Sequence, residues 1–221
     1  MSVRVLVVDD QELFRGGFGM ILAAESDITV VGEAADGIEA VEKAEALSPD
    51  VVVMDIRMPR LDGVAATARI CARTPAKVLV LTMFDADEYV YAALRAGASG
   101  FLLKDARRDE LVAAVRVVAD GEALLAPTIT RRLIAQLSGH GHPRPELANR
   151  LSELTDRERD TLRELARGQS NAEIAEALIV SEHTVKTHVS ALLSKLSLRD
   201  RVQAVVFAYE AGLVVPGRDH P

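Results

Sequence analysis

Charged and hydroxyl side chains follow several apolar stretches in the first half of the chain, and together they could bind a cation. They are Asp9 and Asp10 after RVLVV, Asp55 in VVVMD, Thr82 in KVLVLT and Lys104 in GFLLK. Two adjacent carboxylates beside a hydrophobic core repel each other and lose hydration, so a cation must offset the cost. Carboxylate oxygens suit Mg²⁺, which usually keeps several waters. The residue types therefore predict a site for Mg²⁺ or Mn²⁺.

The elements that must position these residues are alternating strands and helices. Strands are predicted over residues 3–9, 28–34, 50–55, 76–82 and 99–104. Helical spacing of apolar residues lies between them, as over 37–48 and 87–97, and after the last strand over 107–121. This alternation predicts βαβ units, hence an α/β (βα)5 domain with a parallel five-stranded sheet. Parallel sheets bind ligands at the carboxyl ends of their strands. Any one polar residue there could simply belong to a polar loop, but five at one edge indicate a site.

After Leu125 the pattern changes to helices alone. The segment APTITRRLIAQLS predicts a connecting helix, and GHGHPRPE has the composition of a linker. From Leu151 onward the capping boxes TDRE and SNAE mark two helix starts, and a turn at VSE precedes a longer helix over 183–196. With a last helix over 200–212, this predicts a small all-α four-helix domain containing a helix-turn-helix. The predicted domains are residues 1–122 and 151–215, joined by a linker over 123–150.

Composition limits the classes of protein to which the chain can belong. The 221 residues contain no apolar run of membrane-spanning length and a single cysteine, Cys71, which excludes an intrachain disulfide. We therefore expect a cytoplasmic protein without a membrane partner. Residues 1–125 carry 13 basic and 21 acidic side chains, and this excess of negative charge would repel nucleic acid. Any nucleic-acid site must therefore lie in the second half.

Residues 1 to about 122 resemble the receiver domains of two-component response regulators. The resemblance rests on the acidic pair DD, on MDIRMPRLDG around Asp55, on LT at Thr82, and on GFLLKD at Lys104. It implies the flavodoxin-like fold and a phosphoryl group accepted by Asp55 from a sensor histidine kinase. It also implies that Asp10, Asp55 and the backbone carbonyl of Arg57 bind Mg²⁺ directly and Asp9 through water. Lys104 would pair with the phosphoryl oxygens.

The same resemblance implies a switch. Thr82 would hydrogen-bond the phosphoryl group, and Phe101 would rotate into the space that this movement leaves. Two positions depart from the commonest receiver pattern. Met83 is bulky and is expected to narrow access to Asp55, and Asp105 stands where many receivers have a proline. The isomer of the Lys104–Asp105 bond stays open at this stage.

The helix over 183–196 has one apolar and one polar face. Val185, Val189, Leu192 and Leu196 recur at helical spacing and predict the buried stripe. The opposite face is polar and slender, and it suits insertion into a major groove. Ser181 is the predicted N-cap, which leaves the helix start near a phosphate. An amphipathic helix that only turns its polar side to water would show the same pattern.

Residues 151–213 resemble the NarL/LuxR-type DNA-binding domain, on LTDRERDTLRELARGQSNAEIAEAL, VSEHTVKTHVSALLSKL and DRVQAVVFAYEAG. The resemblance implies that HTVKTHVS is the recognition helix. The residues nearest the bases would be Lys186, Thr187 and Ser190, and those nearer phosphates Thr184, Lys195 and Arg201. It implies a dimer through Val202, Val206 and Tyr209 of the last helix. Few phosphate contacts per copy predict that two copies bind adjacent half-sites of double-stranded DNA.

The leading hypothesis is a phosphorylation-controlled transcription regulator and not an enzyme, forming a homodimer when Asp55 is phosphorylated. A Mg²⁺-dependent phosphatase of the haloacid-dehalogenase type is the alternative from another class. It needs an acid two residues after the nucleophile, where this chain has Arg57. A third hypothesis is a receiver that is never phosphorylated and responds to another signal. The sequence leaves open the stimulus, the operator, the resting oligomeric state, and whether the receiver covers the recognition helix.

Overall fold

The computed structural model describes residues 2–83, 87–121 and 145–214. The chain divides between Leu124 and Leu125 into two compact units, each with its own hydrophobic core. Among the helices in these described ranges, none is both long enough and apolar enough to cross a membrane.

The first unit is built on the predicted parallel sheet of five strands. In spatial order the strands run β2-β1-β3-β4-β5, so the chain crosses from β2 over β1 to β3. The strands are β1 (Val3–Val8), β2 (Ile28–Ala34), β3 (Val51–Asp55), β4 (Lys77–Thr82) and β5 (Gly100–Leu103). The α/β prediction is confirmed.

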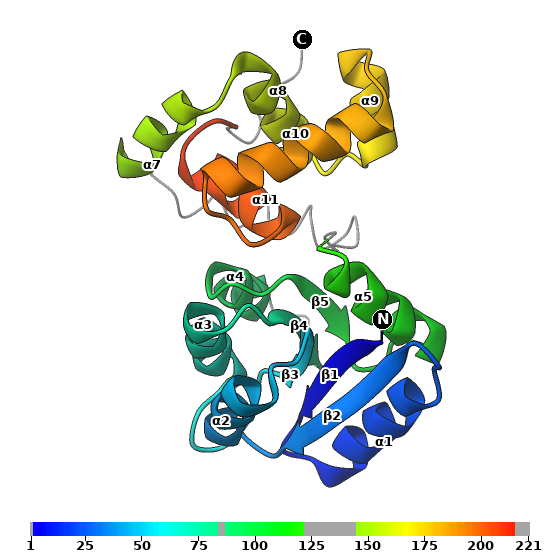
Figure 1. Ribbon diagram of the computed structural model, residues 1–221. Helices are drawn as coiled ribbons and strands as arrows, with labels where there is room; N and C mark the ends of the chain where they lie inside the picture. The colour runs from blue at the N-terminus through cyan, green and yellow to red at the C-terminus, as the bar shows by residue number, and fades with distance from the viewer. Residues whose placement is uncertain (1, 84–86, 122–144, 215–221) are drawn as a thin grey trace. The chain divides into compact units, whose positions relative to one another are not determined.

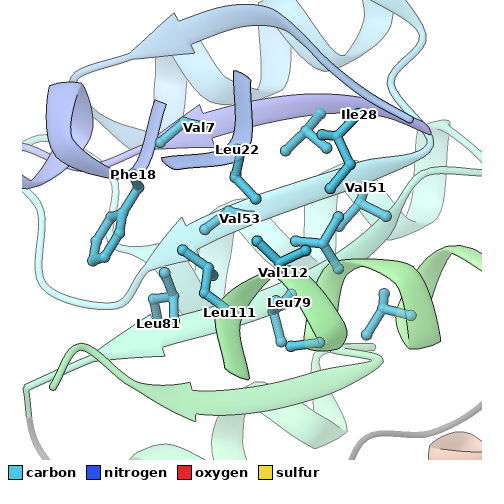
Figure 2. Packing of buried hydrophobic residues seen from close by; sticks show 14 residues of the cluster. Val7, Phe18, Leu22, Ile28, Val51, Val53, Leu79, Leu81, Leu111 and Val112 are labelled. Carbon is cyan, nitrogen blue, oxygen red and sulfur yellow. The ribbon is translucent and has the colours of Figure 1, made fainter. Parts of the chain in front are cut away.

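Helices cover both faces of the sheet, as Figure 1 shows. On one face lie α1 (Glu12–Ala23) and α5 (Arg108–Ala119). On the other lie α2 (Gly37–Leu47), α3 (Gly63–Arg73) and α4 (Asp87–Arg95). Figure 2 shows the first layer, where side chains of alternate strand residues pack against α1 and α5. Both faces of the central strands are therefore apolar, which is why these strands read as continuous hydrophobic runs.

The second unit consists of helices in the described part. These are α7 (Pro145–Arg150), the 3-10 turn η1 (Leu151–Glu153), α8 (Asp156–Ala166), α9 (Asn171–Leu178), α10 (Glu182–Lys195) and α11 (Arg201–Glu210). Both predicted capping boxes are present, Thr155 with Glu158 and Ser170 with Glu173. Gly168 ends α8 with a φ of 81°, a left-handed conformation that glycine adopts without strain.

α7 lies within residues 123–150, which we predicted as a linker containing a helix. It starts at Pro145, and its Leu147 packs against the core of the helical unit. The connecting helix predicted from APTITRRLIAQLS lies outside the described residues.

Candidate functional site

The sheet register brings the predicted acidic residues together. Val8 is paired with Met54, so the next residues, Asp9 and Asp55, leave neighbouring strands at the same edge. Ligand oxygens of Asp9, Asp10 and Asp55 all lie within 4.8 Å of one another. Asp9 and Asp55 are buried and Asp10 is exposed. The cluster thus runs from the hydrophobic core to the surface.

Lys104 provides a cation for this cluster. Its Nζ lies 2.7 Å from Oδ2 of Asp9 and 3.0 Å from Oδ2 of Asp55, and its side chain is 1% exposed. β5 carries it there because the backbone amide of Lys104 donates to the carbonyl of Thr82 at 3.0 Å, which extends the pairing with β4. A buried ammonium shared by two buried carboxylates offsets much of their desolvation cost.

The pKa of the Asp55 carboxyl is raised in spite of this lysine. Burial raises the pKa of its carboxyl, and the hydrogen bond and charge of Lys104 offset this only in part, so the net direction is upward. The charge of Asp9 adds to the increase, and the amide of Ile56 donates to Oδ1 at 2.8 Å. Asp55 is therefore a carboxylate whose charge the site stabilises incompletely.

The donor set fits a hard divalent cation. Three carboxylates against one ammonium leave an excess of two negative charges. A cavity of about 210 Å³ opens on the cluster, with Asp10, Asp55 and Lys104 in its wall. Arg57, whose backbone carbonyl is the further predicted ligand, lines the same cavity. All-oxygen coordination with room for water is what Mg²⁺ prefers.

The two residues predicted to act as a switch, Thr82 and Phe101, lie on the strands that end at this site. Thr82 ends β4 and is buried, and Phe101 is buried on β5 in register with Val80. Met83 is exposed and lines the cavity, at the position where we expected a bulky side chain to narrow access. The Lys104–Asp105 bond is trans, which answers the question that the sequence left open.

Phe14 is a site residue that our reading of the sequence missed. Lys104 Nζ lies 4.8 Å from the centre of its ring, and Phe14 stacks on Phe18 along α1. An aromatic face attracts a desolvated ammonium by up to about 2 kcal/mol. The available signal was an aromatic residue one helical turn after Asp10, but nothing in the sequence pairs it with Lys104.

In the helical unit, α10 presents the two faces that we predicted. Val185, Leu192 and Leu196 are buried and Val189 packs against the same core. Five polar residues are exposed: His183, Lys186, Thr187, Ser190 and Ser194.

The start of α10 is capped by Ser181, as predicted. Its side chain accepts from the amide of Thr184 at 3.1 Å, and the two hydroxyls lie 2.8 Å apart. This cap satisfies one amide of the first turn and leaves the helix start at the surface.

Two predicted phosphate contacts are engaged inside the domain. Lys195 Nζ lies 2.7 Å from Oε2 of Glu158 on α8. Arg201 donates to Oδ1 of Asn171 at 2.8 Å and to the carbonyl of Gln169. These contacts join α10 to α8 and α11 to the start of α9. Both side chains therefore have a structural role that their charge alone did not indicate.

The three residues predicted to form a dimer stripe differ in environment. Val202 and Val206 are buried on α11. Tyr209 is half-buried against the core of the helical unit, and its hydroxyl donates to the carbonyl of Ala166 on α8 at 3.0 Å. The hydroxyl of Tyr209 is thus used within the domain.

A parallel (βα)5 domain with a carboxylate–lysine cluster, followed by a capped helix-turn-helix, defines a two-domain regulator. Residues 5–116 match the response regulator receiver domain, and residues 152–208 match the bacterial regulatory proteins of the luxR family. The chain belongs to the response regulators of two-component systems with a LuxR-type DNA-binding domain.

Full-length relatives agree with this assignment. The chain is 43% identical over 214 residues to the uncharacterized transcriptional regulatory protein YxjL of Bacillus subtilis, covering 96% of this chain and 98% of that one. It is 42% identical to the response regulator protein VraR of Staphylococcus aureus, covering 97% and 100%. These relatives are named as regulators and not as enzymes.

A solved structure supports the domain arrangement along the chain. The response regulator ChrA of a heme-sensing two-component system is 36% identical and covers 96% of this chain and 99% of its own, with a TM-score of 0.53. The receiver and the helical domain therefore occur in this order in a known response regulator.

Proposed function

We propose that Asp55 accepts a phosphoryl group from a sensor histidine kinase and that this controls binding to double-stranded DNA. The observation that carries the proposal is the buried ammonium of Lys104, shared between Asp9 and Asp55 and lining a small cavity. A purely structural ion pair needs neither a third carboxylate nor an opening to solvent.

The residues of the site suit phosphoryl transfer by positioning and charge neutralisation. An oxygen of Asp55 attacks phosphorus, the bond to the histidine nitrogen breaks, and that nitrogen keeps the electron pair and takes a proton. Lys104 already lies 3.0 Å from the attacking carboxylate and can follow the charge onto the phosphoryl oxygens. Asp10, Asp55 and the backbone carbonyl of Arg57 would hold a Mg²⁺ ion, with Asp9 through water, and the ion would supply further neutralisation of the charge on these oxygens.

A kinase needs a surface beside this site. Leu13 and Met20 are large apolar side chains that are exposed on α1, seven residues apart on one helix face. Gly16 and Gly17 lie between them, and nothing stands within 4 Å of the place where a side chain would begin. Exposed apolar residues with small residues between them suit packing against a helix of another protein.

Phosphorylation changes the receiver through Thr82 and Phe101. A phosphoryl group adds −1.5 to −2 charges and three acceptor oxygens, and the Thr82 hydroxyl is the donor at the end of β4. Movement of its loop changes the packing of Phe101, and the face formed by α4, β5 and α5 rearranges. We propose that this face forms the homodimer contacts. Val202 and Val206 of α11 are buried within their own domain, so the stripe predicted on that helix is not available to a second copy.

The dimer presents two copies of α10 to DNA. Lys186, Thr187 and Ser190 are exposed on its polar face and reach base edges, and Thr184 lies near a phosphate at the helix start. A domain with so few basic side chains gains useful affinity when two copies bind together. The protein must meet both its kinase and DNA in one compartment, so we place it in the cytoplasm.

The deciding experiment measures molar mass in solution by light scattering, with Mg²⁺, with and without beryllofluoride as a phosphoryl mimic. We expect the mass to double for wild type and not for Asp55→Asn. Uptake from a small phosphoryl donor, followed by intact-protein mass spectrometry, tests the acceptor separately. Phosphoryl uptake that persists in Asp55→Asn would exclude Asp55 as the acceptor. Phosphoryl uptake by wild type with no change in molar mass in solution would exclude dimerisation as the response.

A further inference from the structure

The loop between β3 and α3 carries Arg57, and its two ends are fixed by backbone contacts. The amide of Gly63 donates to the carbonyl of Ile56 at 2.8 Å, and the amide of Leu61 donates to the carbonyl of Pro59 at 2.8 Å. A Cβ at Gly63 would lie 1.9 Å from the carbonyl oxygen of Asp55, so only glycine allows the loop to close here. The loop thus begins and ends against the phosphoacceptor residue.

The tip of the same loop is fastened to the start of α2. The amide of Gly37 donates to the carbonyl of Leu61 at 3.1 Å, and a Cβ at Gly37 would lie 2.4 Å from that oxygen. Beside it, the guanidinium of Arg60 forms an ion pair with Oδ2 of Asp36. The Asp36 side chain is 2% exposed, and its Oδ1 accepts from the amides of Ile38 and Glu39 as the cap of α2.

Arg60 is held in an unfavourable backbone conformation. Its φ is 66°, in the left-handed region that is unfavourable for a residue with a side chain. Such a conformation persists only where surrounding contacts determine it, and it is found most often at functional sites. Here the contact is an ion pair between a guanidinium on a 61% exposed side chain and a buried carboxylate that is already an N-cap.

We propose that Asp36 and Arg60 are positioning residues for the cation site at Asp55. By fastening the loop tip to α2, they hold the backbone at Arg57, three residues earlier, against the carboxylate cluster. Neither side chain touches the cation. The inference rests on the proposed function, because it assumes that the cluster binds Mg²⁺.

The sign of the effect separates positioning from simple electrostatics. Arg60 is a positive charge near a cation site, so its removal should strengthen Mg²⁺ binding if charge alone matters. If Arg60 positions the loop, its removal should weaken binding. Groups that orient metal ligands typically change metal affinity by 10- to 100-fold, and we expect about tenfold, at the low end of that range.

The test is calorimetric titration of the full-length chain with Mg²⁺ alone, without a phosphoryl donor. Arg60→Asn removes the guanidinium, and asparagine tolerates a positive φ, so the loop backbone can keep its path. Arg69→Asn is the matched control, with the same change of charge at an exposed position of α3. We expect about tenfold weaker binding for Arg60→Asn and no weakening for the control. Equal or tighter binding by Arg60→Asn would overturn the proposal.

A double-mutant cycle tests whether the two residues act as a pair. Asp36→Asn retains a side-chain oxygen to cap α2 but removes the charge that Arg60 meets. Adding Arg60→Asn to it should weaken Mg²⁺ binding little further, whereas independent effects would add and contradict the pairing. Absence of Mg²⁺ binding by wild type would instead remove the cation site itself, and the positioning role with it.

Discussion

The proposed phosphoryl-acceptor site and the proposed DNA-binding face of α10 differ in the burial and the charge of their side chains. At the receiver site, buried charges share partners, since one lysine serves two carboxylates and a third lies within 4.8 Å. On α10 the proposed DNA-binding face is exposed, polar and nearly uncharged, with Lys186 its one basic side chain among the five exposed residues named above.

This contrast predicts different responses to substitution. In the receiver, one substitution changes the electrostatic energy of every charge in the cluster. Buried charges interact strongly, and water cannot replace a lost partner. The five polar side chains of the proposed DNA-binding face of α10 are exposed, so their removal should weaken binding and leave the stability of the fold nearly unchanged.

The largest expected effect is the loss of stability in Lys104→Met. Asp9 and Asp55 would then lie buried without their ammonium, and removing one partner from a buried ion pair costs about 3 kcal/mol or more. Urea unfolding without divalent cations measures this cost. Lys43→Met, which removes a partly exposed lysine paired with Glu39 on α2, is the control and should cost only about 0.5 kcal/mol. Equal costs would mean that the receiver cluster is no more coupled than a surface pair.

The second prediction concerns the opposite change. Asp55→Asn removes one of three clustered carboxylates, so the free energy of unfolding at pH 7 without Mg²⁺ should rise. Wild type should gain about 2.7 kcal/mol from Mg²⁺ at a hundredfold excess over its Kd, and the variant should gain much less. Thermal unfolding with and without Mg²⁺ measures both effects.

The pH dependence follows from the raised pKa of Asp55. The folded protein binds this proton more tightly than the unfolded chain does, so wild type regains stability as pH falls through the raised value. Asp55→Asn has no such proton, and its advantage over wild type should shrink between pH 7 and pH 4. An advantage that is constant over this range would argue that the Asp55 carboxyl is not destabilised by burial.

Much of the receiver site could be predicted because it depends on register. Five strands of known period in a parallel sheet bring their carboxyl ends to one edge, so residue types after each strand suffice to place Asp9, Asp55, Thr82 and Lys104 together. The polar face of α10 was predictable for the same kind of reason, a regular helical repeat.

Contacts between distant loops could not be predicted in this way. The Asp36–Arg60 pair joins two loops whose separation depends on the packing of α2 against α3, which no local pattern encodes. The resemblance to the NarL/LuxR-type domain placed Lys195 near a phosphate, whereas its partner in the structure, Glu158, lies 37 residues earlier. A polar residue after a strand can be located from sequence, but a charged side chain's choice of partner needs the tertiary fold.

The next prediction tests the exposed surface. Lys186→Met should weaken binding to a selected DNA site about tenfold, which corresponds to a base contact worth about 1.4 kcal/mol. Its effect on the urea midpoint should be negligible, because the side chain is exposed. Fluorescence anisotropy with beryllofluoride and Mg²⁺ present measures the affinity. A large loss of stability with unchanged affinity would reverse the proposed contrast between the two surfaces.

The smallest expected effect is that of Lys195→Met. Lys195 lies on the same helix as Lys186, but it forms an ion pair within the domain. The Lys195 side chain is 39% exposed and that of Glu158 is 7% exposed, so the pair should contribute below about 1 kcal/mol. Burial raises the pKa of Glu158, but hydrogen bonds from Lys195 and Thr155 outweigh it and lower the pKa overall. The contribution is therefore present above pH 4.5 and is lost as pH falls through the lowered value.

Binding to DNA separates the two roles that Lys195 could have. If it only fastens α10 to α8, the slope of log affinity against log salt should be the same for Lys195→Met and wild type. If it also meets a phosphate, as the family resemblance implied, the slope should decrease by about 0.9. We expect an unchanged slope together with a small loss of stability that disappears in acid, because Glu158 already occupies the ammonium at 2.7 Å.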